Sequence, residues 1–331
     1  MKFMSKRVAV FSAAAIAAAT VLAWAQDRVF RVQVDLVTLS VTVQDNKNRY
    51  INDLKPADFK ILEDGIVQKI TTFAEGNRPA LAINDDGTTR PLIGTEEVGK
   101  PGLDIRSDSL VGTSVFVLFD TSNFMYRGFV YAEDAIADFV RGLDRADSVA
   151  VYTFSRNLKR NGPLTKDRSE AILGLRKSVA GDDTALYNGL LLTLRDAAKV
   201  AGRKVVIVFS NGPDNASMVA PDDVRVVAED EGIPIYVIST NEVNKDAISS
   251  GVFKRLTSRT GGQAYWAKSW QKQVEAFELI REGLGNSYTL TYYPQPNPNE
   301  GYRKISVEIT SDPGKKYRLR YRLGYRPRAA Q

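Results

Sequence analysis

The chain has 331 residues, 44% of them apolar and 25% charged, which is typical of a globular protein of about two domains. It contains no cysteine and no histidine, so disulfides, thiolate metal sites, cysteine nucleophiles, a Ser-His-Asp triad and an H-E-x-x-H zinc site are excluded. The net charge is +6, but Lys2, Lys6 and Arg7 carry part of it. The remaining excess is too small to predict nucleic-acid binding.

Residues 1–25 predict a secretory signal peptide. Their positive start is followed by an uncharged run from Val8 to Ala25, which ends in the small-x-small sequence Ala23-Trp24-Ala25. The alternative is a retained anchor, but the run is borderline in length for a span and its many alanines make it weakly apolar. We expect cleavage after Ala25, no membrane span in the mature chain, and a periplasmic or extracellular location.

Residues 26–75 predict a small β domain. The stretch "FRVQVDLVTLSVTV" alternates apolar and polar residues. Further on, Asp64-Gly65 predicts a hairpin turn, because both residues tolerate positive φ. This domain is marginal in length for independent folding and is expected to pack on another part of the chain. Residues 76–112 carry prolines, glycines and scattered apolar residues, which predicts a linker or irregular loop.

Strand and helix patterns alternate from residue 113 to residue 284. The first strand, "SVFVLFD", is continuously apolar until Asp120, as expected when both faces of a parallel sheet are covered. Strands are expected at 114–120, 148–154, 204–210, 233–239 and 263–267, and helices at 129–143, 182–199, 246–260 and 270–284. The alternation predicts an α/β fold with a doubly wound, mostly parallel sheet.

Residues 285–331 return to a strand pattern. These strands could extend the main sheet or pair with the N-terminal β domain, and we favour the pairing because neither segment has enough core alone. The stretch "KKYRLRYRLGYRPR", Lys315 to Arg328, has seven basic residues and no acid. It could grip nucleic acid or an anionic surface; an alternating strand with one packed face is the interpretation we favour.

Polar residues follow three of the predicted strand-to-helix connections. Asp120 closes the first strand of the sheet, Thr184 lies at the start of a helix, and Asn211 follows a buried strand. Ligands of doubly wound sheets bind at the carboxyl ends of the strands, near the switch in strand order. The three residues are therefore expected to meet at one edge of the sheet.

This arrangement resembles the von Willebrand factor A domain over residues 113 to about 284. The resemblance implies a metal-ion-dependent adhesion site, in which Asp120 and Ser122 match the first loop and Thr184 the second. Asn211 stands where the family has an aspartate, and Phe124 where it has a second serine. The whole layout, with "DLKPADFKILEDGIVQKI" before this domain and "GYRPR" after it, also resembles a bacterial secreted family of A-related proteins.

The two departures predict a degenerate ion site. Mg²⁺ requires oxygen ligands and negative charge, and Phe124 offers no oxygen while Asn211 offers no charge. We expect weak or absent Mg²⁺ binding and no other cofactor. Plainer roles exist for the same residues: Asp120 and Ser122 can satisfy loop amides, and Asp183 or Thr184 can cap the helix that follows.

The resemblance favours a protein-binding module that uses the loop rim to hold an unidentified protein partner. The rim is expected to contain Asn123, Phe124, Met125, Tyr126, Asp183 and Asp214. One alternative is a structural envelope component that associates with itself. A less favoured alternative is an aspartate-based or metal-assisted hydrolase, but a haloacid-dehalogenase-type phosphatase would need aspartate where Ser122 stands. We therefore expect no enzymatic activity.

Overall fold

The computed structural model describes residues 36–92, 95–97, 104–106, 112–241, 245–312 and 314–327. At 95–97, 104–106, 126 and 127 it describes the backbone alone. The predicted signal segment, residues 1–25, and the last basic residue, Arg328, lie outside the described residues. Within the described part of the chain, no helix is long and apolar enough to cross a membrane.

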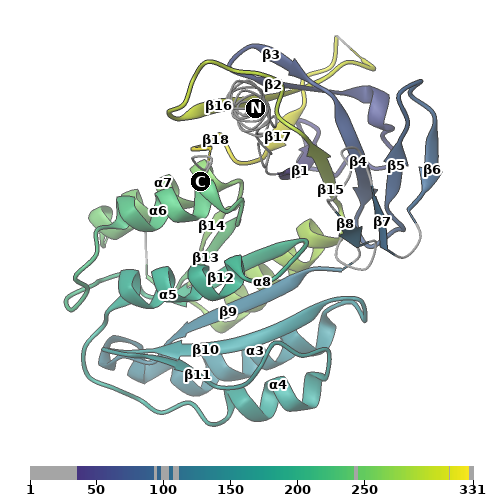
Figure 1. Ribbon diagram of the computed structural model, residues 1–331. Coiled ribbons are helices and arrows are strands. Elements are labelled where there is room, and N and C mark those ends of the chain that lie inside the picture. The colour runs from purple at the N-terminus through teal and green to yellow at the C-terminus, as the bar shows by residue number, and fades with distance from the viewer. Residues whose placement is uncertain are drawn as a thin grey trace, which may run out of the picture. The chain divides into compact units, whose positions relative to one another are not determined.

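A mostly parallel sheet forms the centre of residues 114–285, in the strand order β11-β10-β9-β12-β13-β14 (Figure 1). Its strands are β9 (Ser114–Asp120), β10 (Ser148–Phe154), β11 (Leu158–Arg160), β12 (Lys204–Ser210), β13 (Ile235–Ser239) and β14 (Ala264–Trp266). All neighbours are parallel except β11, which is antiparallel to β10. The chain continues from β9 to β10 on one side and later to β12 on the other. The switch in strand order, where α/β proteins bind ligands, therefore lies at the carboxyl end of β9.

Helices cover both faces of this sheet, which confirms the doubly wound α/β fold. One face packs against α3 (Phe129–Gly142), α4 (Arg168–Leu175) and α8 (Trp270–Gly285). The other packs against α5 (Leu186–Ala198), α6 (Pro221–Asp230) and α7 (Ala247–Thr260). The 3-10 helix η2 (Asn123–Gly128) leads from β9 into α3. Helices α4 and α6 were absent from the prediction.

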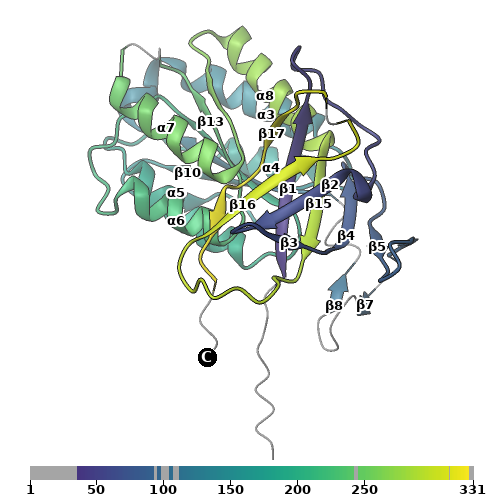
Figure 2. The ribbon, with the colours of Figure 1, turned by 90° about the horizontal axis from the view of Figure 1, so that it is seen from above.

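The strands at the two ends of the described chain pack together, as predicted. One sheet has the order β17-β1-β15-β4-β5-β6 and a second the order β18-β16-β2-β3. Their bounds are β1 Val37–Gln44, β2 Phe59–Glu63, β3 Ile66–Gln68, β4 Ile70–Glu75, β15 Ser287–Tyr292, β16 Arg303–Ile309, β17 Arg318–Arg320 and β18 Gly324–Tyr325. The 3-10 helix η1 (Pro56–Asp58) precedes β2. The two sheets share one apolar core, and β16 and β2 cross β1 and β15 in Figure 2.

The segment 76–112 differs from the predicted irregular linker. It contains β5 (Leu81–Ile83) and β6 (Thr89–Pro91), which continue the first antiparallel sheet beyond β4. It also contains a pair of short strands, β7 (Thr95–Glu97) and β8 (Asp104–Arg106). Each of these strands is only three residues long, too short to give a readable alternation in the sequence.

The antiparallel sheets contact the amino ends of the parallel strands through Arg203, the residue before β12. Arg203 is 6% exposed, and its guanidinium donates to the carbonyls of Gly76 and Leu284 and to Ser287 Oγ. These partners belong to the turn after β4, to the end of α8 and to the start of β15. One buried cation therefore ties three segments together at this edge.

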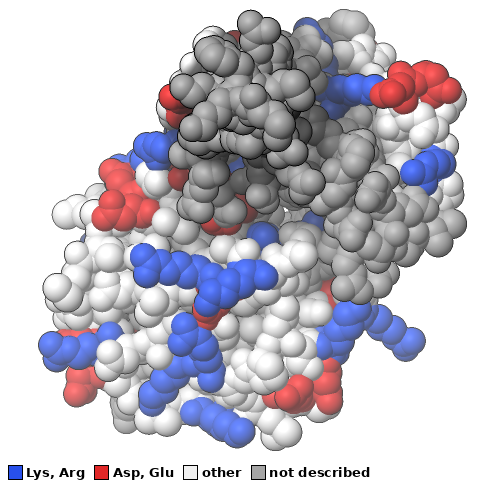
Figure 3. Space-filling model, in the orientation of Figure 1, with Lys and Arg blue, Asp and Glu red and all other residues white. Residues whose placement is uncertain are grey.

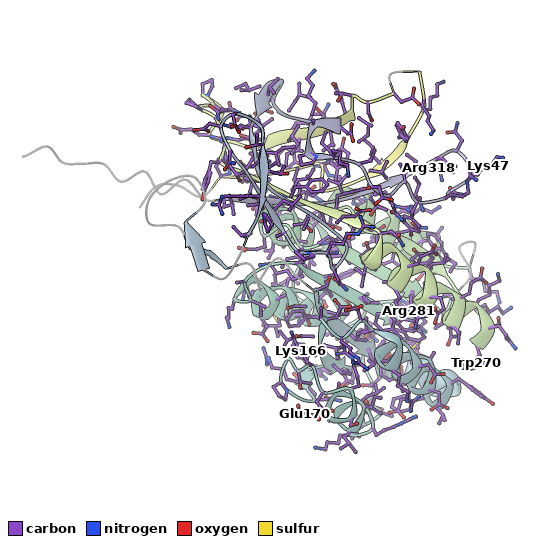
Figure 4. The ribbon with its side chains drawn as sticks, turned by 90° about the vertical axis from the view of Figure 1, so that its right-hand side faces the viewer. Lys47, Lys166, Glu170, Trp270, Arg281 and Arg318 are labelled. Carbon is purple, nitrogen blue, oxygen red and sulfur yellow. The ribbon has the colours of Figure 1, made fainter. Side chains whose placement is uncertain are left out.

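A second buried arginine, Arg322, makes a similar connection from the C-terminal segment. It donates to the carbonyl oxygens of Glu229 and Asp230 at the end of α6, where the helix dipole favours a positive charge. Arg318 donates to Asn48 Oδ1 on the turn after β1, and Figure 4 shows Lys47 and Arg318 close together, with Trp270 at the far end of α8. The amino edge of the parallel sheet is thus occupied by the antiparallel strands.

Candidate functional site

Asp120 is the last residue of β9 and is completely buried. Its Oδ1 accepts from the backbone N–H of Ser122 at 2.9 Å, and its Oδ2 accepts from Ser210 Oγ at 2.6 Å. Burial raises the pKa of the Asp120 carboxyl above its usual value, and the bonds from Ser210 and Ser122 partly oppose this shift. The carboxylate lies where the strand order switches, as the fold requires of a ligand-binding residue.

The second loop brings Thr184 against the third loop. The backbone N–H of Thr184 donates to Asn215 Oδ1 at 2.9 Å, and its carbonyl accepts from the N–H groups of Asn215 and Ala216. The same loop reaches the first one, because the Gly181 N–H donates to the Thr121 carbonyl at 2.8 Å. The three predicted loops therefore meet at one edge of the sheet.

Asn211 joins the third loop to the first. Its Nδ2 donates to the carbonyl of Phe124 at 3.1 Å, and this bond fixes the orientation of the amide. Its Oδ1 is buried and has no hydrogen-bond partner among the described residues. The Phe124 side chain itself is 48% exposed, so the residue that replaces the family's second serine points an apolar ring toward solvent.

Three side-chain oxygens of this site lack partners. Among the described residues, none offers a hydrogen bond to Ser122 Oγ, Thr184 Oγ1 or Asn211 Oδ1, and all three atoms are buried. The Ser122 hydroxyl lies near enough to the Asp120 carboxylate to lower its pKa, but outside hydrogen-bond geometry. A buried unpaired polar atom costs about 1–3 kcal/mol. Three such atoms on the loops that meet at this edge are available to a further polar group or ion.

These oxygens fit a hard cation. Ser122, Thr184, Asn211 and Asp120 supply only oxygen donors, as such cations prefer. The set carries one carboxylate, and the described residues contain no group of three or more acidic side chains that could hold a metal. Asp120, Ser122 and Thr184 would hold the ion, and Asn211 would contribute its amide oxygen. The ion would supply a positive charge at the edge, balanced by Asp120.

The two neighbouring aspartates have other partners. Asp214 accepts from the backbone N–H groups of Tyr187, Ala216 and Ser217, and Asp183 pairs with Arg156 at 3.2 Å on the surface. Asp214 thereby caps the start of α5. This differs from the expectation that Asp183 or Thr184 caps the helix, because the capping residue, Ala185, makes no side-chain bond and the third loop supplies the acceptor instead.

The predicted rim is only partly exposed. Asn123 and Phe124 face solvent, whereas Met125 is 4% exposed and packs in the core beneath α3. The placement of Met125 on the rim is therefore wrong, because η2 turns this side chain inward. The side chain of Tyr126 lies outside the described part of the structure.

Exposed apolar residues other than Phe124 lie in segments that follow the carboxyl ends of the parallel strands, and the sequence analysis missed them. Among the described residues these are Val130, Tyr131, Met218, Ile248 and Trp270, each after a parallel strand, and Val179 in the loop before α5. Ser210, which holds Asp120, was also missed. It is the last residue of a buried strand, and that position could have identified it.

The fold and this edge define a doubly wound α/β domain with an oxygen-lined site at its strand switch. Residues 114–278 match the family model of the von Willebrand factor type A domain. The chain thus contains a domain of the von Willebrand factor type A family, as predicted.

Solved structures with similar folds include the conserved hypothetical protein BatB from Bacteroides thetaiotaomicron, 19% identical, covering 52% of this chain and 98% of that chain with a TM-score of 0.43. A von Willebrand factor type A protein from Catenulispora acidiphila is 12% identical, covering 80% of this chain and 73% of that chain with a TM-score of 0.43. The vWF domain of the type V pili tip protein Mfa5 from Porphyromonas gingivalis is 12% identical. The match covers 52% of this chain and 95% of that chain with a TM-score of 0.42.

One curated relative is a dihydroorotate dehydrogenase (quinone) from Rhizobium leguminosarum bv. trifolii, 29% identical over 154 residues. The match covers 46% of this chain and 39% of that protein. The chain thus spans about two fifths of the length of this relative.

Proposed function

We propose that the protein is an exported von Willebrand factor A-type module that holds a protein partner on the loop edge around Asp120. The observation that carries this proposal is the concentration of exposed apolar side chains on that edge. Clustered apolar side chains on a surface mark interaction sites, and aromatic residues beside polar groups are typical of binding hot spots.

Contacts between the loops support this proposal for three of these side chains. The backbone N–H of Met218 donates to Asn188 Oδ1 at 3.1 Å, which holds the Met218 loop over the start of α5. A Cβ added at Gly212 would lie 2.9 Å from Ser249 Cβ, so the first turn of α7, which carries Ile248, packs against the Asn211 loop. Phe124, bound through its carbonyl to Asn211, completes the group. Three loops thereby contribute one exposed apolar side chain each.

The proposal of a binding role rather than catalysis rests on the state of Asp120. Its two oxygens accept hydrogen bonds from within the protein and its exposed fraction is 0%. A nucleophile or general base must reach its substrate. Export is proposed from the signal sequence, and a periplasmic or extracellular partner follows from it.

The test uses the mature protein as bait in an extract of the native cell envelope, with and without a chelator. Phe124→Ser and Ile248→Ser are expected to reduce capture of a specific partner at least tenfold. Val67→Ser is the matched control, because Val67 is an exposed apolar residue of β3, in the antiparallel part. Equal loss in the control would overturn the proposed surface. Capture of the protein's own chain alone would favour the alternative of a self-associating scaffold.

A further inference from the structure

We propose that Met218 is a modification site, at which a peroxide oxidises the thioether to the sulfoxide and thereby weakens binding of the protein partner. This inference rests on the proposed function, because Met218 is one of the exposed apolar side chains of the loop edge. Its side chain is 94% exposed, the highest value among the large apolar side chains of the described residues. The sulfur is therefore accessible to a small oxidant in solution.

Methionine carries all of the sulfur in this chain, since cysteine is absent. Two of the four methionines, Met1 and Met4, lie in the predicted signal segment. Met125 is 4% exposed and lies in the apolar core, where its Sδ accepts from Thr240 Oγ1 at 3.6 Å. The core shields this thioether from an oxidant dissolved in water. Met218 is therefore the methionine of the mature chain that a peroxide reaches first.

Hydrogen bonds fix the backbone on both sides of Met218. The N–H groups of Met218 and Val219 both donate to Asn188 Oδ1, at 3.1 and 3.3 Å. The Ser217 N–H donates to Asp214 Oδ1 at 2.9 Å, and Ser217 Oγ accepts from the Asn188 N–H at 3.0 Å. These bonds fasten the loop to the first turn of α5 and leave the Met218 side chain in solvent.

The same loop is bonded to the second loop of the site. The N–H groups of Asn215 and Ala216 donate to the Thr184 carbonyl at 3.1 Å each. A partner that covers this edge therefore buries the thioether of Met218. Methionine suits such a contact, because its unbranched side chain adapts to the shape of the partner.

The modification is a two-electron oxygen transfer. A lone pair of the sulfur attacks one oxygen of hydrogen peroxide, an S–O bond forms and the O–O bond breaks. The second oxygen takes up the proton of the transferred oxygen and leaves as water, so the sulfur is oxidised and the peroxide is reduced. The sulfoxide is polar where the thioether was apolar. Burying it against the partner without a hydrogen-bond donor weakens binding.

The first experiment treats the folded mature protein with hydrogen peroxide and weighs its proteolytic peptides by mass spectrometry. One added oxygen is expected on the peptide that contains Met218 and none on the peptide that contains Met125. In protein unfolded by urea, both peptides are expected to gain oxygen. Equal oxidation of the two methionines in the folded protein, or none at Met218, would overturn the assignment of the site.

The second experiment measures partner capture from the envelope extract after the peroxide has been removed. The treated wild type is expected to capture about tenfold less of the specific partner than the untreated protein, because an unpaired buried polar group costs about that factor. Met125→Leu is the matched control and is expected to keep this response. Met218→Leu is expected to capture equal amounts with and without treatment. A loss of capture in treated Met218→Leu would overturn the inference.

The two proposals fail in different ways. Untreated protein that captures no specific partner would overturn the proposed function, and the effect on binding with it. Selective oxidation of Met218 that leaves capture unchanged would overturn this inference alone. Methionine sulfoxide reductases acting on both sulfoxide epimers are expected to restore capture. A loss that persists after the sulfoxide has been reduced would show that Met218 is not its cause.

Discussion

The double substitution Phe124→Ser with Asn211→Asp is expected to create a divalent-ion site. It restores the second serine and the second aspartate that the von Willebrand factor A resemblance predicts and this chain lacks. The new carboxylate balances the second charge of Mg²⁺ or Mn²⁺, and the new hydroxyl adds a ligand beside Ser122. We expect the double variant to bind a divalent ion that the wild type binds weakly or not at all.

The size of the gain follows from the charges. Two unit charges about 4 Å apart attract by about 4 kcal/mol at an effective dielectric constant of about 20, and a divalent ion doubles this to about 8 kcal/mol. Burying the carboxylate costs several kcal/mol. The substitution also removes the Asn211 Nδ2 bond to the Phe124 carbonyl, which costs about 1–2 kcal/mol. Both costs lower the stability of the ion-free variant rather than its ion affinity, and the ion's loss of water offsets part of the attraction. We expect a gain of at least about 3 kcal/mol, roughly a hundredfold in affinity.

Isothermal titration calorimetry with Mg²⁺ and Mn²⁺ measures this gain, and circular dichroism verifies the fold. Asn215→Asp is the control, because it adds the same charge to the same loop while retaining the oxygen that accepts from the Thr184 N–H. The ion-free double variant should be less stable than the wild type, and the ion should restore its stability. A double variant that folds and still takes up no divalent ion would refute the assignment of Asp120, Thr184 and Asn211 to the family's ligand positions.

Three further predictions concern Asp120 and Gly212 at the site and Arg203 at the amino edge of the sheet. Burial raises the pKa of Asp120, so wild-type stability falls as pH rises from about 4 through that raised value. The free energy of unfolding of Asp120→Asn, measured with urea, should therefore rise relative to that of the wild type over this pH range. A difference between the two that does not change with pH would contradict this. Arg203→Met should lose about 3 kcal/mol of unfolding free energy, and a loss below about 1 kcal/mol would show that the buried contacts matter little. Gly212 has φ +116°, so Gly212→Ala should lower the free energy of unfolding by about 1–2 kcal/mol and weaken partner capture. Unchanged capture would show that this turn is not part of the binding site.

The sequence predicted the α/β fold because buried parallel strands and amphipathic helices have different periodicities. The five strands predicted between residues 113 and 284 correspond to β9, β10, β12, β13 and β14. Asp120, Thr184 and Asn211 were placed at one edge because the carboxyl ends of parallel strands meet there. Helix α6 was missed although Pro221, followed by Asp222 and Asp223, is a recognisable helix start.

The remaining features depend on tertiary contacts that no local pattern encodes. Met125 and Phe124 are neighbours in the sequence and both apolar, yet one is buried and the other half exposed. Asp214 caps α5 from a loop that is distant in sequence. The strands β5 to β8 are stabilised by pairing rather than by an alternating pattern. The exposed apolar residues that follow the parallel strands come from separate loops, so they can be recognised as exposed only in the folded protein.

The basic C-terminal segment illustrates why the loop edge is the surface that we assign to a partner. Arg320 donates to Gln44 Oε1 at 2.6 Å and to Gln263, and Arg322 is buried against the end of α6. These guanidinium groups are hydrogen-bonded within the protein, which favours an alternating strand with one packed face over a nucleic-acid-binding segment. Lys and Arg side chains also gather over α5 and β11 in Figure 3, but there Arg160 and Lys199 pair with Asp196. Since Arg203 and Arg322 join the amino edge of the parallel sheet to the antiparallel strands, a ligand of this domain has the opposite edge available, whose loops carry both exposed apolar side chains and unpaired oxygens.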